Sequence, residues 1–364
     1  MGMIMLGIGP SPSVAAPPIE AKQARAPAVP KELGRIAWLR GFEAAARRAK
    51  AERKPLLVLF QEVPGCSTCV NYGNRVLSHP LLRDAAESLF VPVAVYNNIK
   101  GDDERTLTSF KEAAWNNPVV RIITPDRKPL APRVAGDYSI GGLASSMVAA
   151  LKSAHRDVPA YLALLAEECA ARKRGLKRAT FAMHCFWEGE GALGNVRGVI
   201  TTMPGFLDEK EVVEVEFDPE SVDYKALVAR AKALKCASEV FARDTDQQAV
   251  AKRVVGAATI RTDAPVRPDK QPKYYLSKTE YRHIPMTSLQ ATRVNAALGR
   301  KENPDAYLSP GQLRLLASIR KHPKAKWPGA IGVPDLSRAW LAAERVALTI
   351  EGADSPRLGS AGGG

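Results

Sequence analysis

The fold of the first part of this chain is decided by the stretch Pro55-Leu56-Leu57-Val58-Leu59-Phe60 and by the Cys66-Ser67-Thr68-Cys69 that follows it. The apolar run predicts a buried strand, and the two cysteines stand where that strand gives way to a helix. Two thiols three positions apart form a dithiol that can close into a disulfide. The amide N–H groups and macrodipole of a helix N-terminus stabilise a thiolate, so Cys66 is predicted to be the nucleophile.

The same two cysteines also fit half of a zinc site, which is the alternative to a redox dithiol. A zinc site needs two further ligands, normally from a second close pair. The other cysteines, Cys169, Cys185 and Cys236, stand singly, and Cys169 has the helical spacing of a core residue. A lone C-x-x-C after a strand therefore favours redox chemistry, and no metal and no cofactor is expected.

Further elements surround the dithiol. An amphipathic helix is expected over 42–51, apolar runs over 89–95 and 119–123 predict two more strands, and a helix is expected over 141–154. This order resembles the thioredoxin fold. In that family a cis-proline precedes the strand that faces the dithiol, and Pro118 stands at that place. The resemblance implies that Pro118 takes part in substrate binding, because a cis bond turns the backbone toward the two sulfurs.

The dithiol segment differs from the common thioredoxin motif W-C-G-P-C, because it has neither the tryptophan nor the proline between the cysteines. Its sequence is Val63-Pro64-Gly65-Cys66-Ser67-Thr68-Cys69. They resemble the bacterial thioredoxin-like (seleno)protein family named for a V-P-G-U-x-x-T motif. In that family the position of Cys66 often holds selenocysteine, and Cys69 stands where the motif has threonine. The resemblance implies that Cys66 attacks and that Cys69 resolves.

A second region combines strand and helix patterns. Residues 179–190 predict a strand that ends in Cys185 and two aromatic residues, followed by small residues that open a helix. Residues 196–203 predict another strand, and 211–217 alternate between polar and apolar residues as a half-buried strand does. With a helix expected over 224–235, the β-α-β-β-α order predicts a ferredoxin-like sandwich.

The residues Cys185-Phe186-Trp187, with Glu190, match the signature G-C-F-W-x-x-E of the class A peptide methionine sulfoxide reductases. The strand that starts at Glu211 matches a second signature of that family. The resemblance implies that Cys185 attacks the sulfoxide sulfur and that Phe186 and Trp187 hold the methyl group of the substrate. It also implies that Glu211 protonates the leaving oxygen.

The region departs from that family at several positions. The two oxygen-binding tyrosines are missing, because Phe206 stands in the substrate pocket where one is expected and Ala249 lies near the other. His184 replaces a glycine, and its expected role is structural. Sulfoxide reduction leaves a sulfenic acid that needs a second thiol to condense with it. Cys236 is either that resolving thiol or an ordinary residue at a helix end.

The composition is that of an ordinary soluble protein, with 364 residues of which 46% are hydrophobic and 25% charged. The net charge is +14, but no nucleic-acid motif accompanies the basic residues, so we expect a solvated basic surface and no nucleic-acid partner. No run of 18 apolar residues is present, so no membrane span is expected. The protein is predicted to be periplasmic or exported if residues 1–16 end an export signal, and cytoplasmic otherwise.

The chain is thus predicted to be α/β, with a thioredoxin-like domain, a ferredoxin-like α+β domain and a C-terminal helical extension. The predicted segments are a leader or disordered segment (1–32), a thioredoxin-like domain (33–156), a connecting helix (157–178), a methionine sulfoxide reductase-like domain (179–262), a mainly helical extension (263–350) and a flexible tail (351–364).

The predicted function is that of a thiol-disulfide oxidoreductase that reduces oxidised protein thiols or methionine sulfoxide. The expected partners are oxidised protein or peptide substrates and a reducing thiol partner, and the first dithiol is placed to recycle the second site. Two alternatives stay open. The second domain only recognises substrate, or the protein is a non-enzymatic binder of Cu(I), because the soft thiolates of Cys66 and Cys69 select that ion.

Overall fold

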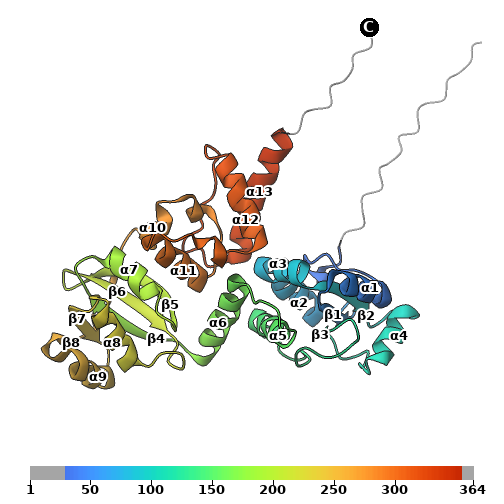
Figure 1. Ribbon diagram of the computed structural model, residues 1–364, viewed down its shortest axis with the longest axis horizontal. Coiled ribbons are helices and arrows are strands. Elements are labelled where there is room, and N and C mark those ends of the chain that lie inside the picture. The colour runs from blue at the N-terminus through green and yellow to red at the C-terminus, as the bar shows by residue number, and fades with distance from the viewer. Residues whose placement is uncertain (1–28, 355–364) are drawn as a thin grey trace, which may run out of the picture.

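The computed structural model describes residues 29–354, so most of the predicted leader and the last ten residues of the predicted tail lie outside the described part. The first domain is built on a three-stranded sheet in the order β2-β1-β3 (Figure 1). Its strands are β1 (Leu56–Gln61), β2 (Val91–Tyr96) and β3 (Val119–Ile123). The central strand β1 is parallel to β2, antiparallel to β3 and buried along its whole length.

Helices cover both faces of this sheet. Because side chains alternate along a strand, Leu57 and Leu59 of β1 enter one core and Val58 and Phe60 enter the other. The second core is closed by α1 and α4, whereas α2, α3 and α5 close the first. The helices are α1 (Phe42–Glu52), α2 (Ser67–Tyr72), α3 (Pro80–Leu89), α4 (Asp102–Ser109) and α5 (Ile140–Ser153), with a 3₁₀ turn at Lys31–Leu33 and a π-helical turn at Gly73–Leu77.

The predicted strands of this domain are present. The strand expected over 119–123 is β3 at those bounds, whereas the strand expected over 89–95 starts two residues later. Leu89 instead ends α3, which begins at Pro80 and carries the chain up to the edge of the sheet. The mixed α/β order confirms the predicted fold class.

Helix α6 (Ala160–Arg174) follows and packs on both parts of the molecule. Tyr161, Leu162 and Leu165 join the core of the first domain. Leu164 and Ala171 lie on another side of the helix and pack with residues from the second domain and from the C-terminal helices. The helix is therefore a packed element between two bodies and not an exposed spacer.

The second domain holds a six-stranded sheet in the order β8-β7-β4-β6-β5-β9. Its four inner strands in the order β7-β4-β6-β5, with α7 after β4 and α8 after β6, have the predicted ferredoxin-like arrangement. The elements are β4 (Lys177–Ala182), α7 (Phe186–Gly194), β5 (Val199–Leu207), β6 (Lys210–Phe217), α8 (Tyr224–Ala233), β7 (Glu239–Ala242), α9 (Thr245–Val255), a 3₁₀ turn at Gly256–Ala258, β8 (Thr259–Arg261) and β9 (Arg267–Pro268).

Two of the predicted strands in this domain have different ends. The strand expected to reach Cys185 stops at Ala182, and Cys185 instead caps the N-terminus of α7. The strand expected over 196–203 begins at Val199, because residues 196–198 form the turn that follows α7. The small residues after Cys185 form the helix that was expected there, α7, which packs on β5.

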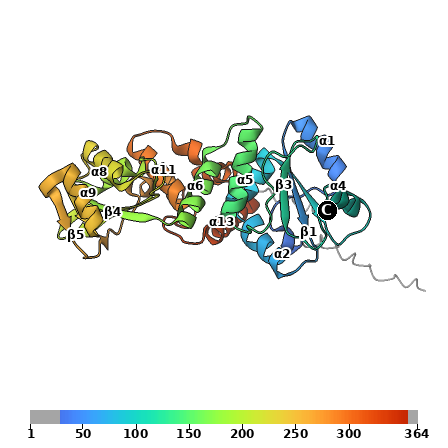
Figure 2. The same ribbon diagram turned by 90° about the horizontal axis from the view of Figure 1, so that it is seen from below.

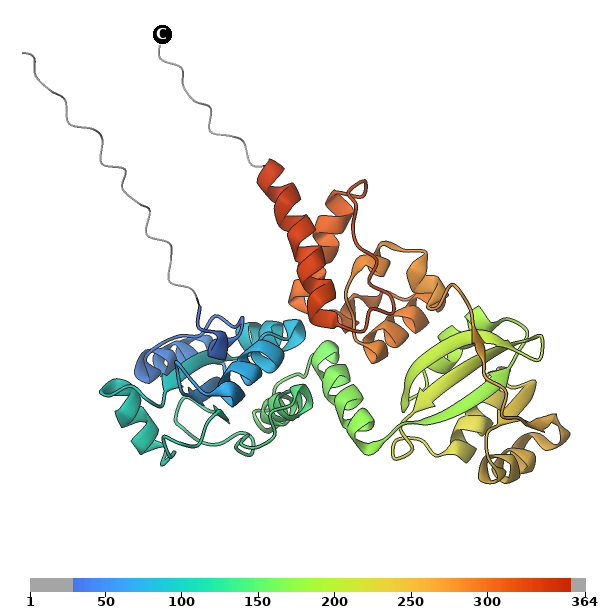
Figure 3. The same cartoon turned by 180° about the vertical axis from the view of Figure 1, so that it is seen from behind.

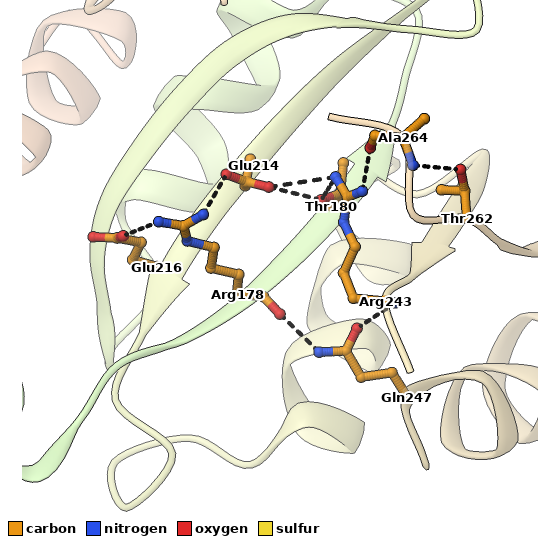
Figure 4. Close-up of polar contacts among 8 residues, drawn as sticks. All are labelled: Arg178, Thr180, Glu214, Glu216, Arg243, Gln247, Thr262 and Ala264. Atoms are coloured by element: carbon orange, nitrogen blue, oxygen red, sulfur yellow. Dashed lines mark hydrogen bonds and ion pairs between the residues drawn. The ribbon is translucent and has the colours of Figure 1, made fainter. Parts of the chain in front are cut away.

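The face of this sheet away from α7 and α8 carries a network of charged side chains (Figure 4). Arg178 pairs with Glu216 at 3.4 Å, and Arg243 donates to Glu214 and to Thr180, each at 3.4 Å. These groups join β4, β6 and the residue that follows β7. The network therefore pairs these exposed and half-buried charges with one another.

The C-terminal residues form a helical layer that joins the two domains (Figures 1 and 3). Helix α11 packs on α7, β5 and α6, whereas α12 and α13 pack on α3. At the second contact, the buried carboxylate of Asp84 accepts hydrogen bonds from the Ser309 hydroxyl and from the Gly311 amide. The layer contains α10 (Tyr274–Ser277), α11 (Ser288–Gly299), α12 (Pro310–Lys321) and α13 (Leu336–Asp354), with 3₁₀ turns at Glu280–His283 and Pro304–Tyr307.

The two ends of the layer differ from the expected pattern. Helix α13 continues to Asp354, so the first residues of the segment predicted as a flexible tail are helical. The short strand β9 pairs with β5 before the layer begins. Among the described residues, no helix combines the length and the apolar character that crossing a membrane requires.

Candidate functional site

The first candidate site is the dithiol at the start of α2. Cys66 caps this helix and is exposed, whereas Cys69 is buried one turn later. Both thiols are free, and their sulfur atoms lie 3.4 Å apart. The loop before them is held by the Gly65 amide, which donates to the buried carboxylate of Glu32 at 2.8 Å. A Cβ atom on Gly65 would lie 2.8 Å from the Cβ of Cys69, so this close approach requires glycine.

The two thiols differ in acidity. The backbone N–H of Cys69 lowers the pKa of the Cys66 thiol, because it stabilises the thiolate. Burial, followed by the hydrogen bond to Cys66, raises the pKa of the Cys69 thiol to about 12. At neutral pH the exposed sulfur thus has the greater thiolate character, and the buried sulfur keeps its proton.

A second loop lies against the buried thiol. The Sγ atom of Cys69 donates to Oδ1 of Asn117, which directly precedes Pro118. The Asn117–Pro118 peptide bond is cis, and Pro118 is buried at the start of β3. Sequence reasoning singled out Pro118 but missed Asn117, for which the position before the proline was the only available signal.

Exposed apolar side chains lie in the two loops that contact the dithiol segment. Asn98 accepts a hydrogen bond from the Val63 amide, and its neighbour Ile99 is 46% exposed. Trp115, two residues before Asn117, is 83% exposed. Large apolar side chains exposed near a reactive group are typical of a surface that binds a polypeptide.

A carboxylate also lies beside the two sulfurs. Glu62, Cys66 and Cys69 each offer one ligand atom, and these three atoms lie within 4.8 Å of one another. No other group of three or more metal-ligating side chains is found among residues 29–354. Two thiolates and a carboxylate are a donor set that fits zinc or another thiophilic ion. The spacing of the two cysteines also fits metal ligands, whereas no pattern in the sequence marks Glu62 as a third.

The second candidate site is centred on Cys185. This cysteine is half-buried and caps α7, so its sulfur lies at the N-terminus of a nine-residue helix. The Glu211 carboxylate, at the start of β6, accepts a hydrogen bond of 2.8 Å from the Phe186 amide in the first turn of that helix. The structure therefore brings Glu211 to Phe186, the residue next to Cys185, across 25 positions of sequence.

Aromatic rings form one side of this site. Phe186 is buried and meets Phe206 edge to face, with 5.2 Å between ring centroids. Trp187 lies 5.5 Å from Phe186 and stacks on Tyr274, with 4.0 Å between centroids and 12° between ring planes. The three aromatic residues that the sequence placed at the site are thus together. Tyr274, from the C-terminal layer, was not foreseen there.

The other cysteines are placed differently. Cys236 is buried beyond the end of α8, and burial, with the nearby Glu188 charge, raises the pKa of its thiol to about 11. In the described part of the chain no hydrogen bond joins its sulfur to that of Cys185. Cys169 is half-buried against the core of the first domain, and burial raises the pKa of its thiol. His184 is exposed in the loop before α7.

The two candidate sites lie in different domains. Helix α2 belongs to the body at one end of the molecule and α7 to the body at the other, with α6 and the C-terminal layer between them (Figures 1 and 2). Thiol–disulfide exchange requires that a thiolate reaches a sulfur. In this arrangement α6 and the C-terminal layer separate the two candidate sites of one chain.

Comparison with known proteins supports the resemblance to thioredoxin-like proteins and, over a short stretch, the resemblance to peptide methionine sulfoxide reductases. Residues 37–125 match the family model described as thioredoxin-like. The solved structure of a DsbH oxidoreductase covers 35% of this chain and 90% of its own, with 17% identity and a TM-score of 0.28.

Other matches are peptide methionine sulfoxide reductases. The enzyme of Methanoculleus marisnigri is 36% identical over 75 residues, which cover 16% of this chain and 46% of the relative. The A5 enzyme of Arabidopsis thaliana is 35% identical over 68 residues, covering 15% of this chain and 27% of the relative. The match therefore spans less than half the length of these relatives. The chain contains a thioredoxin-like domain at 37–125 and, in addition, a stretch similar to part of the peptide methionine sulfoxide reductases.

Proposed function

We propose that this protein is a thiol-disulfide oxidoreductase in which Cys66 is the nucleophile and Cys69 the resolving thiol. The observation that carries this proposal is the asymmetry of the pair: an exposed sulfur with a lowered pKa lies 3.4 Å from a buried, protonated one. The thioredoxin-like match and the resemblance of the motif to the V-P-G-U-x-x-T family support the same chemistry.

The reaction transfers two electrons and two protons to a substrate disulfide. The Cys66 thiolate attacks one substrate sulfur, which forms a mixed disulfide and releases the other sulfur as a thiol. Cys69 then attacks the Cys66 sulfur, and the second substrate thiol leaves. In this proposal the exposed side chains of Trp115 and Ile99 contact an oxidised protein or peptide. The backbone at the buried Pro118 adds a contact near the two sulfurs.

The dependence of Cys66 alkylation on pH tests this assignment. Because the pKa of Cys66 is lowered, its reaction with iodoacetamide should reach half of its maximal rate below about pH 8.5, the value for an ordinary thiol. Cys69 should stay unreactive throughout, since its pKa is about 12. Peptide mass mapping after timed alkylation measures both rates, with Cys169 as the internal comparison. A half-maximum for Cys66 at or above pH 8.5 would contradict the proposal.

For the second domain we propose reduction of methionine sulfoxide by Cys185. The Cys185 thiol and the sulfoxide yield the thioether and a cysteine sulfenic acid, so the substrate sulfur gains two electrons and the cysteine sulfur loses two. The hydrogen bond between Glu211 and the first turn of α7, and the grouped rings of Phe186 and Trp187, support this proposal. The similarity to peptide methionine sulfoxide reductases supports it as well.

The sulfenic acid has to be reduced before a second turnover. Condensation of Cys185 with the Cys236 thiol releases water and leaves a disulfide, which a dithiol then reduces. Because the two sites lie in different domains, we propose that this dithiol comes from a second copy of the chain or from another reducing thiol protein.

Metal binding is a second candidate function, and the cluster of Glu62 with the two thiols favours it. If the cluster holds a metal, protein purified without oxygen should contain about one Cu(I) or zinc ion per chain, because two thiolates and a carboxylate suit such ions. Elemental analysis measures this content. Glu62→Gln should then weaken the binding. Metal-free protein that also takes up no added Cu(I) would exclude this function.

A further inference from the structure

The turn before Cys66, residues 63–65, is held by a side chain that precedes the thioredoxin-like match at 37–125. Glu32 is 7% exposed, and its carboxylate accepts the hydrogen bond of 2.8 Å from the Gly65 amide. Gly65 directly precedes the nucleophile. This hydrogen bond therefore restrains the backbone from which the Cys66 side chain projects.

The segment around Glu32 is itself fixed against the helix that carries the dithiol. The fully buried Gln61, at the end of β1, donates from its Nε2 atom to the Glu32 carbonyl and, at 3.5 Å, to the Cys69 carbonyl. The backbone of this segment also comes so close to Gly73 that a Cβ atom there would lie 2.0 Å from one of its carbonyl oxygens. The carboxylate is therefore carried by a segment that is packed on α2 and on the turn after it.

Asn98, in the loop after β2, holds the same turn through two hydrogen bonds. Its Oδ1 atom accepts from the Val63 amide at 3.2 Å, and its Nδ2 atom donates to the Pro64 carbonyl at 3.4 Å. Asn98 is exposed, so these contacts do not belong to the packed core. Each of the three residues before Cys66 is thus hydrogen-bonded to a side chain from another part of the chain.

The reactivity of Cys66 depends on where its sulfur lies. The backbone N–H of Cys69 lowers the pKa of the Cys66 thiol only while the sulfur stays beside the first turn of α2. Because Cys66 is exposed, packing around its own side chain does little to keep the sulfur there. The backbone before Cys66 has to supply that restraint.

We propose that Glu32 and Asn98 are positioning residues of the dithiol site, which hold residues 63–65 and thereby keep the Cys66 sulfur beside the first turn of α2. This inference rests on the proposed thiol-disulfide chemistry of Cys66. Neither side chain transfers electrons or protons, because both act through the backbone before the nucleophile. The reactivity of the dithiol thus depends on two distant side chains as well as on the spacing of the cysteines.

Glu32→Ala and Asn98→Ala test the inference, with the pH dependence of Cys66 alkylation by iodoacetamide as the measurement. In both proteins the pH of half-maximal rate should rise by about half a pH unit or more, toward about 8.5, the value for an ordinary thiol. Loss of the negative charge of Glu32 would by itself lower this midpoint, because a nearby negative charge disfavours a thiolate. A rise therefore reports the lost hydrogen bond.

Two further variants serve as controls. Glu32→Gln keeps an oxygen that accepts from the Gly65 amide, so its midpoint should not rise above that of the wild-type protein. Glu87→Ala, on α3, removes another carboxylate that accepts from a backbone amide, that of Ala37 at 3.0 Å. It should leave the midpoint at the wild-type value, because it does not hold the turn before Cys66.

The outcomes separate this inference from the proposed function. An unchanged or lowered midpoint in either alanine protein would overturn the inference, and so would a midpoint in Glu32→Gln as high as in Glu32→Ala. If Glu32→Ala does not fold, Asn98→Ala decides, because Asn98 is exposed. A wild-type protein that reduces no protein disulfide would overturn the proposed function, whereas raised midpoints in the alanine proteins would still support the positioning role.

Discussion

A Cys66→Ser protein is expected to lose disulfide reductase activity by a factor on the order of a thousand or more, because the attacking thiolate is gone. The reduction of a model protein disulfide measures this loss. Cys69→Ser should have a different effect, since Cys66 can still attack but the mixed disulfide is not resolved. Mass spectrometry should then detect a stable adduct through Cys66.

The same Cys69→Ser protein identifies the sulfur that Cys66 meets. After mild oxidation, we expect its adducts to join two chains or a chain and a substrate, because α6 and the C-terminal layer stand between the sites of one chain. Cys169→Ser is the matched control and should keep full activity, because Cys169 packs against the core of the first domain. Full activity in Cys66→Ser would overturn the assignment of the dithiol.

A Cys185→Ser protein is expected to have no methionine sulfoxide reductase activity, since no other thiol lies at the start of α7 to accept the oxygen. Glu211→Gln should lower kcat about a hundredfold, as expected when a general acid is lost. The glutamine can still accept the hydrogen bond from the Phe186 amide, so the helix N-terminus should be retained. Turnover of peptidyl methionine sulfoxide with dithiothreitol measures both effects.

Glu209→Gln is the matched control for this experiment. Glu209 lies two residues before Glu211 in the turn between β5 and β6 and is exposed, so the same change of side chain there should leave kcat within twofold. Equal activity in the Cys185→Ser and wild-type proteins would show that the second domain only recognises substrate. Activity lost in Cys185→Ser but kept in Glu211→Gln would assign proton donation to another group.

The local patterns near Cys66 were sufficient to predict the first domain. An apolar run of strand length, a close pair of cysteines and a proline before the next apolar run all lie within 64 residues, Pro55 to Pro118. Burial of β1 follows from the apolar run, because short-range periodicity is displayed directly by a sequence. The cis bond at Pro118 was instead implied by the resemblance to the thioredoxin fold.

The sequence pattern around Cys185 predicted the ends of the strands in the second domain less accurately. Alternation predicted β6 well, but no periodicity marks where β4 stops, and the strand was extended three residues too far, to Cys185. After Ala182 one more hydrogen bond, from the Met183 amide to the Glu211 carbonyl, joins the chain to β6 before it turns into α7. The position of that turn is a property of the sheet and helix together, which composition does not display.

The sequence by itself determined the candidate site residues, because thiols, aromatic rings and carboxylates at short spacing are visible in any chain. Only the tertiary structure decided which distant groups join them. Asn117 reaches Cys69 over 48 positions, and Tyr274 reaches Trp187 over 87. Such contacts result from the packing of whole elements. For Tyr274 that packing is fixed by the buried pair of Lys273 and Glu190, and no local pattern in the sequence records that pair.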